Sequence, residues 1–281
     1  YWYIRGDADL GNSSIPLGAV PMAINGFGLE VGNNVEFANT SVAPKRSSAV
    51  FGGNIKFLSY PDMGSTFKIE GGFQASFNTR TFSISELTIL GQVGLMGSDF
   101  PSVQSSGDRF NGRCTMTYDF ENHVFSANAD AYLRAAGGMI RGRNRGDRLG
   151  SVDILFSSEN WHIMVGRPSW SEGRVGLKIG FPGIADVSTS GYFMMGTNLP
   201  NTEFPPQVIQ KFQREQIRLP QQIQIVSGVA HGSSFEISTG KQEFLIFYGQ
   251  FDLVVGYDIA FGKTEGCVGR SEIGINNWYA S

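Results

Sequence analysis

The chain has 281 residues with 37 glycines and 22 phenylalanines, a charged fraction of 17% and a formal net charge of −3. A charged fraction below the roughly 25% of an average globular chain suits glycine-punctuated strands. The net charge gives no general attraction to nucleic acid, so no nucleic-acid partner is expected. No run of about 18 apolar residues is present, which excludes a conventional transmembrane helix.

The opening residues, YWYIRGDADLG, already follow a strand pattern and contain no charged segment followed by an apolar one, as a secretory signal would. We therefore expect a mature or excised piece of a larger protein. Alternation continues in residues 67–77, where Phe67, Ile69 and Phe73 share one face while Lys68 and Glu70 share the other. This pattern is typical of a strand with one dry and one wet face.

Three successive hairpins are predicted in the middle of the chain. Their strands lie within 113–134, 152–165 and 175–196, with turns at 121–123, 158–160 and 182–183. Such short connections join antiparallel neighbours, because a parallel crossover needs a dozen or more residues. The sequence therefore predicts an all-β fold, an antiparallel meander that forms a large sandwich or barrel.

One segment departs from the strand pattern. Pro206 can occupy the first turn of a helix, Val208, Ile209 and Phe212 fall on one helical face, and Pro220 would end it. We predict one short helix near residues 205–218. It divides the chain into a β meander at 1–200, a helix-containing connector at 201–222 and a C-terminal sheet continuation at 223–281, with a single domain as the alternative.

The C-terminal part alternates over residues 243–262 without a recognisable turn. This pattern predicts one long bent strand, or two strands that meet at a bulge. The two cysteines, Cys114 and Cys267, have no metal-binding spacing. They are either free or joined in a single disulfide, which would close a loop of about 150 residues.

No motif for catalysis emerges. The three histidines lack the close spacing of a helical zinc site, and residues 262–264, GKT, follow an apolar strand rather than a flexible phosphate-binding loop. Asp252 and Asp258 share one side of a strand about 20 Å apart, farther than the roughly 5–9.5 Å of a glycosidase pair. We therefore expect a non-catalytic protein with no metal and no cofactor.

Positive charge is concentrated in residues 139–150, MIRGRNRGDRLG, which carry Arg141, Arg143, Arg145 and Arg148. One interpretation is a glycine-rich hairpin loop with solvated arginines. The other is a site for an acidic protein, an anionic glycan or a lipid head group, since arginine binds carboxylate and phosphate through two hydrogen bonds. Trp170 falls in a loop, where it either caps the sheet or offers its ring to a partner.

Several segments carry a family resemblance: GSVDILFSSENWHIMVGRP, RVGLKIGFPGIADVSTSGYFMMGTNLP, the proline-marked helix and the close CVGRSEIGINNWYAS. Together they resemble segments of very large, secreted or envelope-associated β-rich proteins of Bacteroidetes-type bacteria. The likeness covers roughly residues 114–281 and carries no established activity. It implies an extracellular, cell-surface or outer-membrane location and a scaffold or binding role. The arginine cluster is not part of the pattern.

Three classes of function remain open. The favoured one is a non-catalytic secreted or envelope module that presents its rim loops, including Trp170, to other envelope proteins or assembles with itself through its sheet edges. The second is an outer-membrane β-barrel component, whose design also uses alternating strands of about ten residues. The small side chains of Ala127, Ala129 and Ala131 favour close packing instead. The third is a carbohydrate-binding or glycan-active domain.

Overall fold

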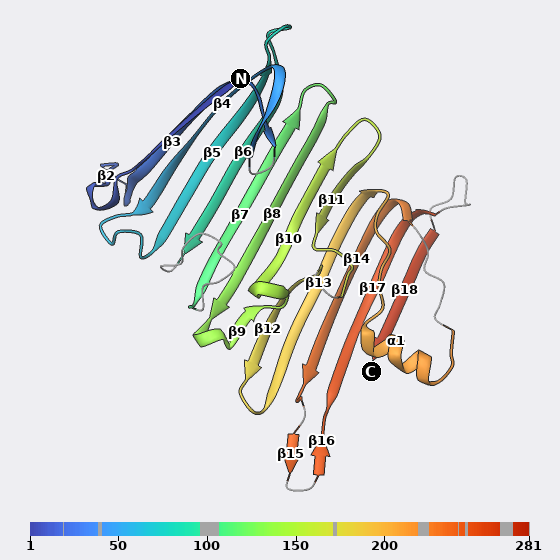
Figure 1. The fold of residues 1–281 in the computed structure, drawn as a ribbon. Helices are drawn as coiled ribbons and strands as arrows, with labels where there is room; N and C mark the ends of the chain where they lie inside the picture. The colour runs from blue at the N-terminus through green and yellow to red at the C-terminus, as the bar shows by residue number, and fades with distance from the viewer. Residues whose placement is uncertain are drawn as a thin grey trace. The chain divides into compact units, whose positions relative to one another are not determined.

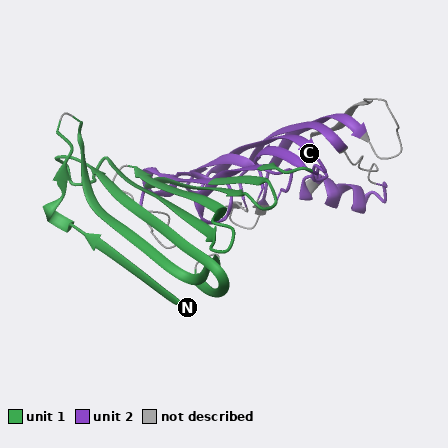
Figure 2. Ribbon diagram, turned by 90° about the horizontal axis from the view of Figure 1, so that it is seen from above, with its two compact units in different colours: residues 1–105, 109–129, 155–158 green, residues 106–108, 130–154, 159–281 purple. Residues whose placement is uncertain are grey.

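The computed structural model of the chain describes residues 1–18, 20–38, 41–95, 107–170, 173–218, 225–240, 242–244, 247–264 and 272–280. The fold consists of two compact units (Figure 2). Unit 1 comprises residues 1–105, 109–129 and 155–158, and unit 2 comprises residues 106–108, 130–154 and 159–281. The connector predicted at 201–222 therefore lies wholly within unit 2.

Unit 1 is an antiparallel meander of long strands (Figure 1). The strands are β1 (Trp2–Asp9), β2 (Ile15–Pro16), β3 (Met22–Ala38), β4 (Ser41–Ser59), β5 (Phe67–Asn78), β6 (Ser83–Leu95), β7 (Arg109–Asp119) and the first part of β8 (Val124–Ala135). Apart from the short β2, which pairs with β3, each strand pairs with the next one along the chain, in the order β1-β3-β4-β5-β6-β7-β8. A single 3-10 turn, η1 (Gly11–Ser13), follows β1.

The turn between β7 and β8 shows why these hairpins could be predicted. The Asp119 side chain accepts hydrogen bonds from the backbone N–H groups of Glu121 and Asn122, each at 2.9 Å. His123 has a φ of 53°, in the left-handed region. An aspartate that caps the backbone of the next residues is a local turn device, so its signal is present in the sequence. The predicted turn at 121–123 is confirmed.

Unit 2 contains the rest of β8 and two short 3-10 turns, η2 (Ala136–Gly138) and η3 (Arg145–Asp147). Its strands are β9 (Ile140–Gly142), all but the last two residues of β10 (Arg148–Phe156), β11 (Trp161–Val165), β12 (Val175–Phe181), β13 (Ala185–Thr197), β14 (Ile225–Ser238), β17 (Asp252–Thr264) and β18 (Glu272–Ala280). The order β11-β13-β14-β17-β18 forms the sheet, and β12 pairs with both β13 and β9 (Figure 1). The hairpins predicted around 158–160 and 182–183 are confirmed.

The predicted helix is present as α1 (Pro206–Arg214), with Pro206 in its first turn. It packs against the sheet of unit 2, where Val208 joins a buried cluster with Trp170, Phe204 and Val254. No helix within the described part of the chain is long and apolar enough to cross a membrane.

The prediction of a single long strand, or of two strands meeting at a bulge, over residues 243–262 is wrong. Two short strands, β15 (Gln242–Phe244) and β16 (Phe247–Gly249), pair with each other as a separate two-stranded sheet. The long strand β17 begins only at Asp252. In the sequence, apolar residues continue from the end of β15 to the start of β16, with no glycine or proline between them. Alternation alone therefore cannot reveal that the strands are separate.

The all-β class, the antiparallel meander and the short helix predicted near residues 205–218 are thus confirmed. Closure of the meander into a sandwich or a barrel stays a prediction.

Candidate functional site

The arginine cluster at residues 139–150 is not a free loop. It forms β9, the turn η3 and the start of β10. Arg143 Nη2 lies 2.7 Å from Glu236 Oε1, and Arg148 Nη1 lies 3.3 Å from Asp130 Oδ1. Arg145 is exposed, and Arg141 is half-buried within β9. Two of the four arginines are therefore held by carboxylates of their own unit rather than solvated.

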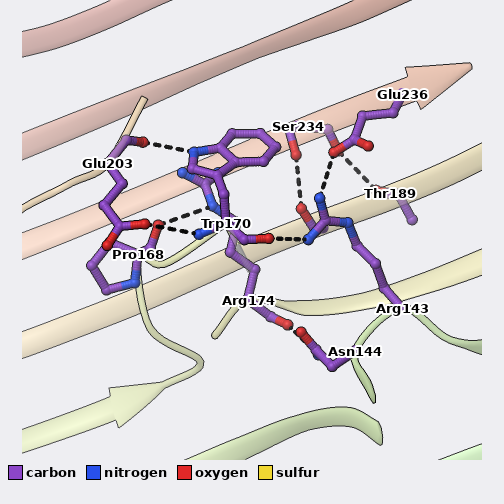
Figure 3. A network of polar contacts seen from close by, with 10 residues as sticks. Arg143, Asn144, Pro168, Trp170, Arg174, Thr189, Glu203, Ser234 and Glu236 are labelled. Carbon is purple, nitrogen blue, oxygen red and sulfur yellow. Dashed lines mark hydrogen bonds and ion pairs between the residues drawn. The ribbon is translucent and has the colours of Figure 1, made fainter. Parts of the chain in front are cut away.

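Trp170 is 6% exposed and joins this network (Figure 3). Its ring lies 3.9 Å from the Arg174 guanidinium carbon and 5.4 Å from that of Arg143. The indole Nε1 donates to the backbone oxygen of Glu203 at 2.6 Å, and Arg143 Nη1 donates to the backbone oxygen of Trp170 at 3.2 Å. Cation–π contacts of this kind stabilise a desolvated ring. Trp170 thus anchors its own loop to the sheet, which is the capping role, and offers no free ring.

Arg174 is the centre of the network and was missed by the sequence analysis. Its side chain is fully buried and lies 3.1 Å from Asp258, which is also fully buried. Its backbone oxygen accepts a hydrogen bond from Asn144 Nδ2 at 2.7 Å. The partners are 84 and 30 residues away in sequence. No local pattern can therefore reveal this pairing.

These charges all lie on one face of the sheet of unit 2, which we call the covered face. Tyr192, Met194, Ala230 and Ala260 share it. The segment around Trp170 lies over this face, beside Glu203 from the residues before α1 (Figure 3). Val208 of α1 packs there too, in the cluster with Trp170 and Val254. Unit 2 thus uses its own chain to enclose the face that carries the ion pairs.

The opposite face of unit 2, which we call its apolar face, is not covered by a helix or loop from the described residues in this way. By register, it presents the odd-numbered residues of β12, β13, β14 and β17. None of those between residues 175 and 261 is Lys, Arg, Asp or Glu. Large apolar side chains on it are exposed, among them Ile179, Phe181, Phe193, Phe235, Val255 and Phe261.

His231 lies on this apolar face together with the smaller polar residues Thr189, Thr197, Ser227 and Ser233. The hydrogen bonds of its ring stay within the sheet. Its Nδ1 lies 2.9 Å from the backbone oxygen of Tyr192, and its Nε2 lies 3.0 Å from the Tyr257 hydroxyl. Both ring nitrogens therefore have partners without water or an outside ligand.

Unit 1 repeats this two-faced design. The cross-strand registers of β1 and β3–β7 bring the side chains of one face into line. This aligned face carries no Lys, Arg, Asp or Glu, and we call it the apolar face of unit 1. Its members include Trp2, Ile4, Phe27, Leu29, Val31, Phe51, Phe73, Ile89, Phe110 and Met116, all at least 36% exposed.

The other side of unit 1, its polar face, carries a hydrogen-bonded row. Glu30 accepts from Tyr3 at 2.5 Å and from Gln74 at 3.0 Å. Glu70 accepts from the side-chain amides of Asn54 and Gln92, each at 2.8 Å. A hollow of about 290 Å³ lies over this row. Each carboxylate is satisfied by uncharged donors from neighbouring strands.

Aromatic side chains mark both ends of the apolar face of unit 1. Trp2 and Phe77 belong to one cross-strand row, which runs through Asn33 and Ala49. At the far end, Phe67 and Phe110 lie in a row through Leu95. From Phe67 to Phe77 the chain extends about 33 Å at strand rise.

The remaining predicted candidates are placed as follows. Cys114 is half-buried on the apolar face of unit 1 and forms no disulfide with any of the described residues. Cys267 lies outside the described residues, so a pairing between the two stays a prediction. Within the described ranges, no group of three metal-binding side chains comes together. Asp252 and Asp258 have different partners: Asp252 accepts hydrogen bonds from Ser238 and Gln250, whereas the buried Asp258 is paired with Arg174.

Comparison with known proteins gave no match to a family model, a curated protein or a solved structure. The function must therefore be argued from the two faces themselves.

Proposed function

We propose that this chain is a structural component of a membrane, with the apolar faces of both units in contact with lipid acyl chains and their strands crossing the bilayer. One observation carries the proposal. Within the part of the chain that the structure describes, unit 2 covers its charged face with its own helix and loop and leaves large apolar side chains of the opposite face exposed.

In water, covering the apolar face would be more favourable than covering the charged face. Burying one large apolar side chain contributes about 1.5–3 kcal/mol, so a water-soluble unit gains most by laying α1 over the apolar face. Isolated exposed apolar residues are ordinary, but large contiguous patches mark membrane or protein contacts. In unit 1, six strands spaced about 4.8 Å apart and about 33 Å long give a patch of roughly 800 Å².

Lipid fits this patch better than a protein partner does. Protein interfaces carry about one hydrogen bond per 100–200 Å² and a polar rim. Among the aligned side chains on the apolar face of unit 1, those able to form hydrogen bonds are the amide of Asn33, the thiol of Cys114 and the hydroxyl of Tyr118. On the polar face the same strands carry Arg5, Glu30 and Glu70. Apolar residues on one side and polar ones on the other are the pattern of transmembrane strands.

The length of the face also matches a bilayer. A strand stretch of about 33 Å tilted by 35–45°, as is typical of transmembrane strands, spans about 25 Å along the membrane normal, close to the apolar band of such proteins. Aromatic residues then fall at both boundaries, where the rows of Trp2 with Phe77 and of Phe67 with Phe110 lie.

In this proposal the role is structural rather than catalytic, and the location is the outer membrane of the cell envelope. The alternative of a rim that presents loops to a partner draws less support. Arg143 and Arg148 have carboxylate partners within unit 2, and Trp170 is buried.

The experiment uses two adjacent positions on β7 that face opposite sides. Cys114 lies on the apolar face and Thr115 on the polar face. With Cys267→Ser in both proteins, one carries a fluorophore at Cys114 and the other, with Cys114→Ser and Thr115→Cys, carries it at position 115. The full chain is reconstituted into vesicles that contain doxyl-labelled lipid.

We expect strong quenching of the label at position 114 and weak quenching at position 115. Equal weak quenching at both positions, with the chain recovered in the aqueous fraction, would contradict the proposal.

A further inference from the structure

Arg141 is the middle member of a row of three cations on the covered face of unit 2. The register places it directly opposite Arg134 of β8 on one side and Lys178 of β12 on the other. Like charges directly opposite each other on neighbouring strands destabilise a sheet. Something must therefore offset this row for β8, β9 and β12 to stay paired.

Two of the three cations have carboxylate partners. Arg134 Nη1 lies 3.3 Å from Asp147 Oδ2, and Lys178 Nζ lies 2.6 Å from Asp186 Oδ2. Among the described residues, Arg141 forms no ion pair with a carboxylate. The row thus retains one positive charge at its centre.

Arg141 also lines a hollow of about 360 Å³ at this end of unit 2. Most of the other lining residues belong to the turns 137–139, 180–186 and 238–240. Gly138 and Gly183 have φ values of 89° and 73°, which glycine adopts at no steric cost, and neither adds a side chain to the wall. Asp186 also lines the hollow, and its carboxylate is paired with Lys178 at 2.6 Å. Arg141 is thus the cation lining this hollow that has no carboxylate partner among the described residues.

We infer that this hollow binds a phosphate group through Arg141. The guanidinium offers parallel N–H donors that match phosphate oxygens in a two-point contact, and the bound charge offsets the cation row. Phe181 and Ile184, 45% and 70% exposed, line the same hollow. The source of the phosphate is either inorganic phosphate or a lipid head group. The lipid source alone rests on the proposed function.

The first test measures the thermal midpoint of the full chain in detergent with and without sodium phosphate, together with a phosphate titration. A ligand that binds only the folded state raises the midpoint. We expect the wild type to respond. Arg141→Gln should bind phosphate at least tenfold more weakly, and in phosphate-free buffer it should melt at or above the wild-type midpoint, because the repulsion is gone.

Arg145→Gln is the matched control, since Arg145 is exposed in η3 and does not line the hollow. It should keep the wild-type phosphate response. A wild type without any phosphate response overturns the inference, whatever the variants do. An equal response in the wild type and Arg141→Gln overturns it as well.

The second test separates the two sources. In vesicles of phosphatidylglycerol, a lipid-occupied site should no longer respond to added inorganic phosphate, whereas in vesicles of a phosphate-free galactolipid the response should persist. A response in both vesicles assigns the site to inorganic phosphate. Because the detergent titration needs no bilayer, its failure is distinguishable from a failure of the membrane proposal.

Discussion

Gly232 shows how a single residue makes room for the buried charges of unit 2. A Cβ at this position would lie 2.0 Å from Asp258 Oδ1 and 2.3 Å from Tyr192 Cε1. Both neighbours are buried, at 0% and 3% exposure, so neither can move aside. The absence of a side chain in β14 is therefore what allows Asp258 and Tyr192 to meet there.

Replacing Gly232 with alanine should destabilise the fold by about 1–3 kcal/mol, the usual range for overpacking a core. The measurement is the denaturant midpoint of the full chain. Gly249→Ala is the control, because a Cβ there has nothing within 4 Å. Equal midpoints for the two variants would show that the contact around Gly232 relaxes freely.

The ion pair of Arg174 and Asp258 should behave differently from an exposed pair. Removing one partner of a buried pair leaves the other charge uncompensated, which typically costs about 3–5 kcal/mol. We expect Asp258→Asn to lower the free energy of unfolding by about that amount, and Arg174→Met with Asp258→Leu to recover much of it. Asp7→Asn, which breaks the exposed contact with Arg5, should change stability little. Chemical denaturation of each variant and of the wild type measures these effects.

At the scale of elements, turns whose signal is local could be predicted, and long-range pairings could not. Asp119 marks the turn after β7 with its own hydrogen bonds, and the Pro182-Gly183 turn joins β12 and β13 as expected. The sequence between β15 and β16 carries no such residue. The contact of Arg143 with Glu236 joins residues 93 positions apart, beyond any local pattern.

The turn between β4 and β5 gives an acid-sensitive element. Hydrogen bonds from Ser59 and Thr66, including one from the Thr66 hydroxyl at 2.5 Å, hold the pKa of Asp62 below its ordinary value. A folded pKa below the unfolded value of about 3.9 means that the turn is fully stabilised at neutral pH and loses this contribution as pH falls through the folded pKa.

We therefore expect the amide of Thr66 to lose protection from hydrogen exchange below about pH 3.9, and Asp62→Asn to remove that pH dependence. Hydrogen exchange by NMR at several pH values measures it. Loss of protection already above the unfolded pKa would contradict the assignment to Asp62.

At the scale of the whole molecule, the two faces of the strands could be predicted but their surroundings could not. The alternation of Phe67, Ile69 and Phe73 with Lys68 and Glu70 correctly separates an apolar from a polar side. The prediction that the apolar side is dry also assumes that other parts of the chain cover it. Alternation shows only which residues share a side, and not what covers that side. Which face is covered depends on the path of distant segments such as α1, and the structure places α1 over the charged face of unit 2.

The membrane proposal predicts opposite outcomes for one substitution at two adjacent residues. Met116 and Thr115 are both exposed on β7 and face opposite sides. In a bilayer, arginine at a lipid-facing position near the midplane costs about 2–4 kcal/mol, because the charge must leave water. Arginine on the polar face stays hydrated or pairs with neighbouring carboxylates. In water, by contrast, either exposed substitution changes stability by no more than about 0.5 kcal/mol.

We therefore expect Met116→Arg to lower the unfolding free energy of the full chain in lipid vesicles by roughly 2–4 kcal/mol, and Thr115→Arg to leave it nearly unchanged. Denaturant titration in vesicles measures both variants against the wild type. Met116→Gln serves as an uncharged reference of similar size, which separates the cost of the charge from the loss of the apolar side chain. If Met116→Arg folds as stably as Thr115→Arg, the apolar face of unit 1 is not in contact with lipid.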